Sequence, residues 1–181
     1  MTHMRDMARL SMWVCALIAY AALTLSAQAH TPSPSDTLLR IDGDIAQPLA
    51  FTRAALEALP QDTIRAQAHD APAHLYRGVP IAVLLERAGA PSGHALRGPA
   101  LATTIIATAR DGYRVAFSIA ELDTGFVRRR VIVALTADGQ VMSDEDGPLR
   151  IIVEGEGRPA RWIRQLTMLH VQKAPADSPH Q

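Results

Sequence analysis

Few side chains in this sequence are of the types that hold metals or form covalent intermediates. Cys15 is the only cysteine, and no Gly-x-Ser-x-Gly motif is present. His69 and His74 are the only close pair of histidines, and a spacing of five residues does not place both on one helix face, where a helical zinc site needs them. The acidic residues 144–146 lack the alternating spacing of a calcium loop. These residues therefore predict no metal site.

Aromatic side chains are scarce, so each one is a candidate for stacking on a planar ligand. They make up 4% of the sequence, and six of them lie beyond residue 29. Any stacking platform in that part of the chain must come from this set: Phe51, Tyr76, Tyr113, Phe117, Phe126 and Trp162.

The N-terminal segment has the pattern of a secretory signal peptide. Basic residues near the start precede an apolar run at residues 10–25, and residues 27–29 (Ala-Gln-Ala) supply a small-x-small cleavage signal. The apolar run is short for a membrane span, so we expect release rather than retention as an anchor. The sequence thus predicts removal of residues 1–29, including Cys15, and a thiol-free periplasmic protein without direct membrane insertion.

Composition beyond that segment predicts one ordinary domain. The remaining 152 residues carry 16 basic and 17 acidic side chains. This length can bury its own core, and the near-neutral balance lacks the positive charge of nucleic-acid-binding or membrane-binding proteins. Residues 30–36 and 174–181 are Pro-punctuated without apolar periodicity, which indicates a flexible lead and a disordered tail around a domain at residues 37–173.

Local patterns predict short helices early in the chain and strands throughout. Thr52 is a candidate N-cap for a helix that ends before Pro60, and a second helix is expected at residues 81–88. The stretch between them, residues 61–79, is interpreted as irregular. Ser118 opens a capping box and one helical turn. Strands are expected at residues 38–45, 101–109, 113–117, 131–136, 149–153 and 162–171, which gives a β-rich α+β domain.

The order and spacing of several short motifs resemble a known family. The motifs are Leu59-Pro60, residues 76–81 (Tyr-Arg-Gly-Val-Pro-Ile), 111–113 (Asp-Gly-Tyr), 147–150 (Gly-Pro-Leu-Arg) and 161–164 (Arg-Trp-Ile-Arg). Together they resemble the sulfite-oxidase-fold domain, also called the oxidoreductase molybdopterin-binding domain. The resemblance implies mixed β-sheets with short helices, and a groove that holds a pyranopterin with molybdenum in the family's enzymes.

One departure from the family concerns the metal ligand. In the family's enzymes a cysteine thiolate binds molybdenum, and the resemblance places it at about residues 66–69, where this sequence has no cysteine. Molybdenum favours a soft thiolate there, and an imidazole from His69 would be a different coordination chemistry. We therefore expect little or no bound molybdenum and no molybdenum catalysis.

The resemblance also implies which residues would bind a pterin. A pterin is a flat bicycle whose N–H groups donate, whose oxo group accepts and whose faces stack on aromatic rings. Trp162 is the expected stacking face and Arg150 the expected donor to the oxo group. Asp111, Tyr113 and Glu154 are candidates to bind the ring edges.

Further candidate donors surround Trp162 in the sequence. They are Arg158, Arg161 and Arg164, and His69 completes the set. The alternative for Trp162 is a core tryptophan, and for the three arginines a solvated strand edge. Residues 128–130 (Arg-Arg-Arg) are interpreted as a solvated turn or a contact for a partner protein.

The family resemblance leads to a functional hypothesis with two alternatives. Some short exported members of the fold resemble pterin-binding regulators that act on membrane-bound cyclic-di-GMP enzymes. We therefore expect a periplasmic pterin-binding sensor or adaptor that acts on a partner such as a membrane-bound signalling protein. The first alternative is a molybdopterin-dependent oxidoreductase with a non-cysteine metal ligand. The second is a protein-binding module whose groove binds no small molecule.

Overall fold

The computed structural model describes residues 36–68 and 71–175. The expected signal peptide, nearly all of the flexible lead, most of the tail and His69 lie outside the described residues. Within the described part of the chain, no helix is long and apolar enough to cross a membrane.

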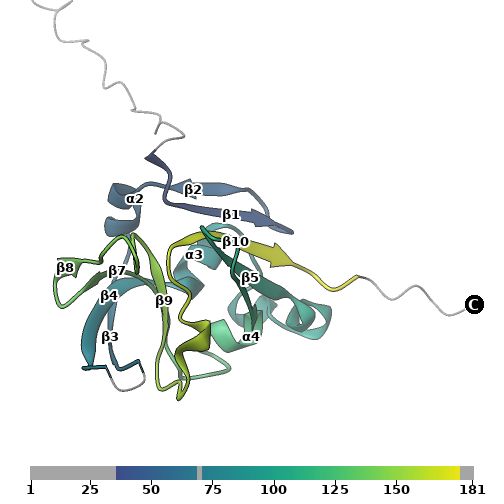
Figure 1. Ribbon diagram of the computed structural model, residues 1–181. Helices are drawn as coiled ribbons and strands as arrows, with labels where there is room; N and C mark the ends of the chain where they lie inside the picture. Colours follow the sequence, from purple (N-terminus) through teal and green to yellow (C-terminus); the bar gives the residue numbers. More distant parts are fainter. Residues whose placement is uncertain (1–35, 69–70, 176–181) are drawn as a thin grey trace, which may run out of the picture. The chain divides into compact units, whose positions relative to one another are not determined.

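Five strands form the first sheet, in the order β2-β1-β10-β5-β6. Figure 1 labels the first four of them. β1 and β10 are parallel, and the other neighbours are antiparallel. The first and last strands of the domain therefore lie side by side, so both ends of the domain are fixed by backbone hydrogen bonds. The strands are β1 (Leu39–Gly43), β2 (Leu49–Phe51), β5 (Thr104–Ala109), β6 (Arg114–Ser118) and β10 (Leu166–Gln172).

A second sheet contains the order β3-β4-β7-β8, with β9 also paired to β7. All of its pairs are antiparallel. β7 pairs with β4 and β9, and its residues 131–135 are all buried, which places it centrally in the sheet and in the core. The strands are β3 (Asp62–Ala66), β4 (His74–Pro80), β7 (Val131–Ala137), β8 (Gln140–Val141) and β9 (Arg150–Val153).

Short helices connect the strands, and two of them are capped as the sequence predicts. The Thr52 hydroxyl accepts from the backbone N–H of Ala55, and Ser118 and Glu121 form a complete capping box. The α-helices are α2 (Arg53–Glu57), α3 (Ile81–Arg87) and α4 (Ile119–Leu122). The 3-10 helices are η3 (Gly93–Ala95), η4 (Gly98–Ala102) and η5 (Pro159–Arg161). The predicted α+β class with mixed sheets and short helices is confirmed.

Three sequence-based expectations about the elements are wrong. Residues 61–79 are not irregular, because β3 and β4 form a hairpin there and β4 continues the sheet to β7. The strand expected at residues 162–171 begins only at Leu166, because Gln165 has a φ of 49° that interrupts the extended backbone. The first residues of the stretch 101–109 belong to η4 rather than to a strand.

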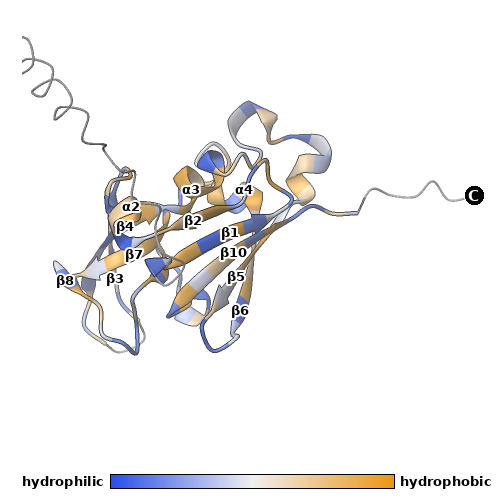
Figure 2. Ribbon diagram, turned by 90° about the horizontal axis from the view of Figure 1, so that it is seen from above, coloured by the Kyte–Doolittle hydropathy of each residue, from blue (hydrophilic) through white to orange (hydrophobic). Residues whose placement is uncertain are grey.

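The hydrophobic core draws on both sheets and on the helices. Every buried residue of the described chain lies between Leu39 and Val171, so this domain carries its own core. α3 buries Ile81, Leu84 and Leu85 on one face. Figure 2 shows the hydrophobic colour along α3 and β7, where the buried side chains concentrate.

Candidate functional site

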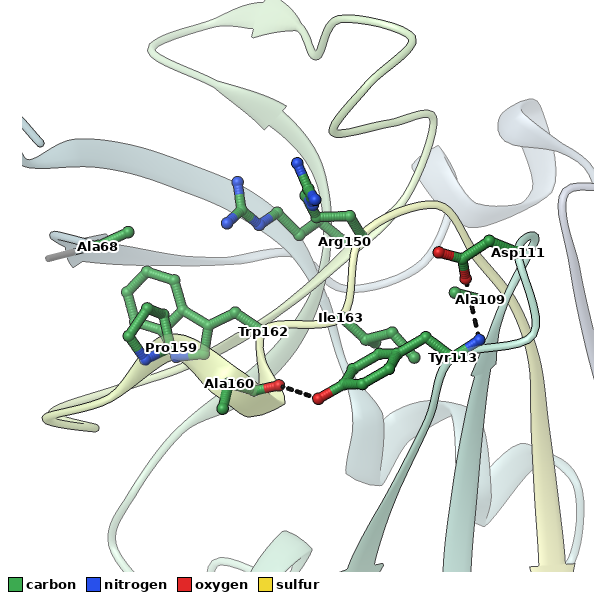
Figure 3. A pocket seen from close by; sticks show the side chains of 10 residues that line it. Ala68, Ala109, Asp111, Tyr113, Arg150, Pro159, Ala160, Trp162 and Ile163 are labelled. Atoms are coloured by element: carbon green, nitrogen blue, oxygen red, sulfur yellow. Dashed lines mark hydrogen bonds between the residues drawn. The ribbon is translucent and has the colours of Figure 1, made fainter.

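A cavity of about 470 Å³ opens between the β5–β6 turn, the start of β9 and the segment around η5 (Figure 3). Its volume lies within the range of small-molecule sites. We call it the indole cavity, and its lining residues are Ala68, Ala109, Asp111, Tyr113, Arg150, Pro159, Ala160, Trp162, Ile163 and Arg164.

Two hydrogen bonds hold the polar wall of the indole cavity together. The carboxylate of Asp111 accepts from the backbone N–H of Tyr113 at 2.9 Å, which fixes the turn between β5 and β6. The Tyr113 hydroxyl donates to the carbonyl oxygen of Ala160 at 3.0 Å, across to η5. Figure 3 shows both bonds beside the cavity. The hairpin and η5 therefore position Tyr113, which is 51% exposed and gives the cavity an open aromatic face.

Trp162 is both a core residue and part of the cavity wall. The residue is 3% exposed, and its indole meets the Tyr76 ring edge-to-face at a centroid distance of 6.3 Å. It caps η5 rather than lying in a strand. Its indole N–H is buried, and no described residue accepts a hydrogen bond from it. Trp162 is therefore a core residue, and it also lines the cavity where a ligand was expected.

Arg150 supplies a second buried donor at the same cavity. Its side chain is 13% exposed, and one terminal nitrogen donates to the Asp146 carboxylate at 2.9 Å. Its Nε–H is buried without a partner among the described residues. An unsatisfied buried donor costs about 1 to 3 kcal/mol, so both this group and the Trp162 N–H favour a ligand or water that accepts from them.

Burial also acts on the titratable group behind the indole. Desolvation raises the pKa of the Tyr76 phenol above its ordinary value, while the nearby charge of Arg150 opposes this rise. The phenol is therefore neutral at physiological pH, and this side of the site is a low-dielectric environment.

Arg161, which was expected at the ligand site, binds other residues of the protein instead. Arg161 donates to Glu156 at 2.7 Å and to Glu121 at 3.0 Å, and its guanidinium lies 4.8 Å from the centre of the Phe117 ring. It is part of an ion-pair network rather than of the cavity wall.

Glu154 also lies away from the indole cavity. Its carboxylate is bound by the guanidinium of Arg130, and this hydrogen bond holds the pKa of Glu154 below its ordinary value. Arg158 is exposed and does not line the cavity, and His69 lies outside the described residues. Of the expected ligand-site residues, the structure brings together Asp111, Tyr113, Arg150 and Trp162, and Arg164 joins them, paired with Glu145 at 2.9 Å.

Some residues of the cavity wall could not be found from the sequence. Pro159, Ala160 and Ile163 line the cavity beside Trp162 but have no polar side-chain group that would indicate ligand binding. Ala68 lies in the stretch where the family resemblance places the metal-binding thiolate, and it lines the cavity with a methyl group. Among the described residues, no group of three or more His, Cys, Asp or Glu side chains could hold a metal ion.

Comparison with known families identifies the fold. The family model of the oxidoreductase molybdopterin binding domain matches residues 27–180. The chain belongs to this family. The family resemblance stated from the motifs is therefore confirmed, and with it the expectation of a molybdopterin-binding oxidoreductase fold.

A solved structure supports the same assignment of the fold. The sulfane dehydrogenase SoxCD from Paracoccus pantotrophus is similar, with a TM-score of 0.58 and 21% sequence identity. The similarity covers 78% of this chain and 39% of the SoxCD chain, so this chain spans well under half of that protein's length. Among proteins with curated functions, none matches the sequence significantly.

Proposed function

We propose that this domain binds a pterin in the indole cavity and works as a sensor or adaptor for a partner protein, without molybdenum catalysis. The observation that carries the proposal is the pair of buried, unpartnered donors, Arg150 Nε–H and the Trp162 indole N–H, at one cavity of suitable volume. Membership of the family makes a pterin the natural class of ligand.

The residues of the cavity match the polar edges of a pterin. The carboxylate of Asp111 can accept from the amino and ring N–H groups, while Arg150 donates toward the oxo group. The exposed ring of Tyr113 offers a face for stacking, and Trp162 lines the same cavity. A bound pterin would supply a ring with oxidised and reduced forms, which gives a sensor two states to distinguish.

The donor set does not favour molybdenum. None of the described lining residues carries sulfur, and Ala68 stands in the stretch that supplies a thiolate in the family's enzymes. A soft metal centre would therefore have to use oxygen or nitrogen ligands. This chemistry supports a binding role over oxygen-atom transfer.

Analysis of the bound small molecules and metals tests the proposal. Protein purified from a host that makes the molybdenum cofactor should release a pterin, identified by mass spectrometry, with molybdenum far below one atom per chain. Molybdenum near one atom per chain would instead support the oxidoreductase with a different metal ligand. A preparation with no pterin, which also fails to bind added oxidised or reduced pterin, would leave a protein-binding module.

The proposal also includes export to the periplasm and a membrane-bound partner protein. The signal-peptide pattern supports cleavage after Ala29 and a periplasmic location. Intact-mass measurement of protein from a periplasmic fraction should give a chain that begins at His30, whereas a chain that retains Cys15 would contradict cleavage. A membrane-bound signalling enzyme as partner rests on the family resemblance alone.

A further inference from the structure

The segment of residues 123–130, which we call the basic loop, leaves α4 beside the first sheet and enters β7 of the second. Its first residue fixes its conformation. The Asp123 carboxylate accepts from the backbone N–H of Gly125 at 2.7 Å and from that of Gly93 at 2.8 Å. The Asp123 carbonyl accepts from the N–H groups of Phe126 and Val127, each at 3.1 Å. The basic loop therefore begins in a closed turn.

The last residue of the basic loop is fixed as firmly. Arg130 donates from Nε to Glu154 at 2.8 Å, and from Nη1 to the carbonyl of Thr63 at 2.8 Å and the carboxylate of Asp62 at 3.2 Å. These contacts join the basic loop to β3 and to the end of β9. The three arginines of residues 128–130 thus differ, because Arg130 is paired with the protein while its side chain is still 40% exposed. The interpretation of these residues as a solvated turn or a contact for a partner protein stays a prediction.

Between these two fixed ends, the basic loop exposes apolar and cationic side chains together. Phe126 is 52% exposed and Val127 is 37% exposed. Arg128 and Arg129 are exposed, and neither forms an ion pair or hydrogen bond with a described residue. Single exposed apolar residues are common on protein surfaces, but here two are adjacent and are followed directly by two unpaired guanidinium groups.

We propose that the basic loop docks on an anionic phospholipid surface. Aromatic rings favour the interface between headgroups and acyl chains, and arginines bind headgroup phosphates while their stems remain in apolar surroundings. Two apolar residues are too few for a stable protein interface, which buries about 800 Å² per partner, whereas weak membrane docking has no such minimum. Because the loop is already fixed, little conformational entropy is lost when it docks.

This inference goes beyond the proposed pterin function and does not depend on it. Whole-chain charge predicts no attraction to membranes, but docking requires only the local charge of Arg128 and Arg129. Docking by the basic loop would hold the domain at a membrane surface reversibly. The apolar residues 10–25 lie outside the tested domain, so they do not contribute to the measurement.

Vesicle co-sedimentation tests the proposal on residues 30–181, which contain the whole described core. The probes are vesicles of phosphatidylcholine alone and of phosphatidylcholine with an equal amount of phosphatidylglycerol, at low salt and millimolar lipid. We expect binding only to the anionic vesicles, weakened by high salt. At about fivefold per arginine, the double variant Arg128→Gln/Arg129→Gln should lower the partition coefficient by roughly 25-fold. Phe126→Ser should lower it by a smaller factor.

Matched controls change similar residues elsewhere on the surface. Arg97→Gln removes another exposed arginine, and Val141→Ser removes another exposed apolar side chain; neither should change the partition. Thermal unfolding should be the same for all variants, because none of these side chains is buried. Three outcomes would overturn the proposal: no binding to anionic vesicles, equal binding by the loop variants, or equal losses in the controls. Loop variants that lose only the response of a partner protein would assign the surface to that partner instead.

Discussion

At the residue scale, two residues that line the indole cavity, Arg150 and Trp162, each have a buried N–H group without a described acceptor. Most buried donors in proteins have partners, so the unpartnered Arg150 Nε–H and Trp162 N–H at one cavity are an exception that a ligand would explain. Arg161 differs from Arg150, because its guanidinium forms ion pairs with both Glu121 and Glu156. The guanidinium of Arg161 is thus satisfied within the fold, whereas the buried Nε–H of Arg150 has no acceptor among the described residues.

Substitution of Trp162 separates its packing role from its donor role. Trp162→Phe keeps an aromatic ring but removes the N–H, so we expect a stable protein that binds a pterin about 1 kcal/mol more weakly. Trp162→Ala should also cost about 3 to 5 kcal/mol of folding stability, because the residue is 3% exposed. Calorimetric titration and urea unfolding measure the two effects. A Trp162→Phe protein that binds as tightly as the wild type would show that the indole N–H does not contact the ligand.

The Tyr76 phenol predicts a loss of stability at alkaline pH. Burial raises its pKa in the folded protein, so above pH 10 the folded state binds more protons than the unfolded state. Its contribution is complete below pH 10 and declines as the pH rises through the folded-state pKa. The Tm of the wild type should therefore fall more steeply above pH 10 than that of Tyr76→Phe, with similar values near pH 7. Parallel curves for the two proteins would contradict the effect of burial.

At the scale of elements, β4, the strand that carries Tyr76, lies very close to β7 at Gly78. A Cβ atom at Gly78 would lie 2.0 Å from the carbonyl oxygen of Val133 and 2.5 Å from the Cα of Ala134. The backbone contact occurs where the pairing register shifts, between Arg77 and Gly78. Only glycine allows these strands to pair so closely.

Gly78→Ala should therefore destabilise the protein by about 1 to 3 kcal/mol or more, because the methyl group overlaps backbone atoms that cannot move without breaking the pairing. Gly157→Ala is the matched control, since a Cβ at that position meets no heavy atom within 4 Å. Urea unfolding should give a change within about 0.5 kcal/mol for the control. Equal midpoints for the two variants would mean that β4 and β7 adjust to the methyl group.

The elements that the sequence predicted correctly have local signals, and those that it missed depend on distant contacts. The caps at Thr52 and Ser118 lie within three residues of their partners, so their helices are visible in the sequence. The β3–β4 hairpin was missed because Ala66 and Gly78 are small and carry no apolar signal at their positions. The pairing of Gly78 in β4 with Ala134 in β7, a strand about sixty residues away, is not encoded locally.

The candidate site also has residues that the sequence identified correctly and residues whose partners only the structure shows. Trp162 and Arg150 could be selected by residue type and motif, and both line the indole cavity. Arg161 and Glu154 were also selected by residue type, but Arg161 binds Glu121, 40 residues away, besides Glu156, and Glu154 binds Arg130, 24 residues away. Only the folded structure decides which charged groups are paired and which are available to a ligand.

At the scale of the whole molecule, ligand binding should stabilise the folded domain. A ligand that binds only the folded state at 100 times its Kd adds about 2.7 kcal/mol to the free energy of unfolding. For a domain of this size, that corresponds to a rise in Tm of about 5 to 10 °C. The test compares thermal unfolding with and without a pterin for the wild type and for Arg150→Gln.

We expect the wild type to show the rise in Tm and Arg150→Gln to show little of it, because the variant lacks the guanidinium that, in the proposed binding mode, donates to the pterin oxo group. Arg150→Gln also loses its ion pair with Asp146, so its Tm without ligand is the reference from which its shift is measured. Asp146→Asn is the control, because it breaks the same ion pair and leaves Arg150 free to bind. A full rise in Arg150→Gln would place the ligand elsewhere, and the apolar cavity of about 660 Å³ that includes Pro91, Pro99 and Ala100 would be the next site to test.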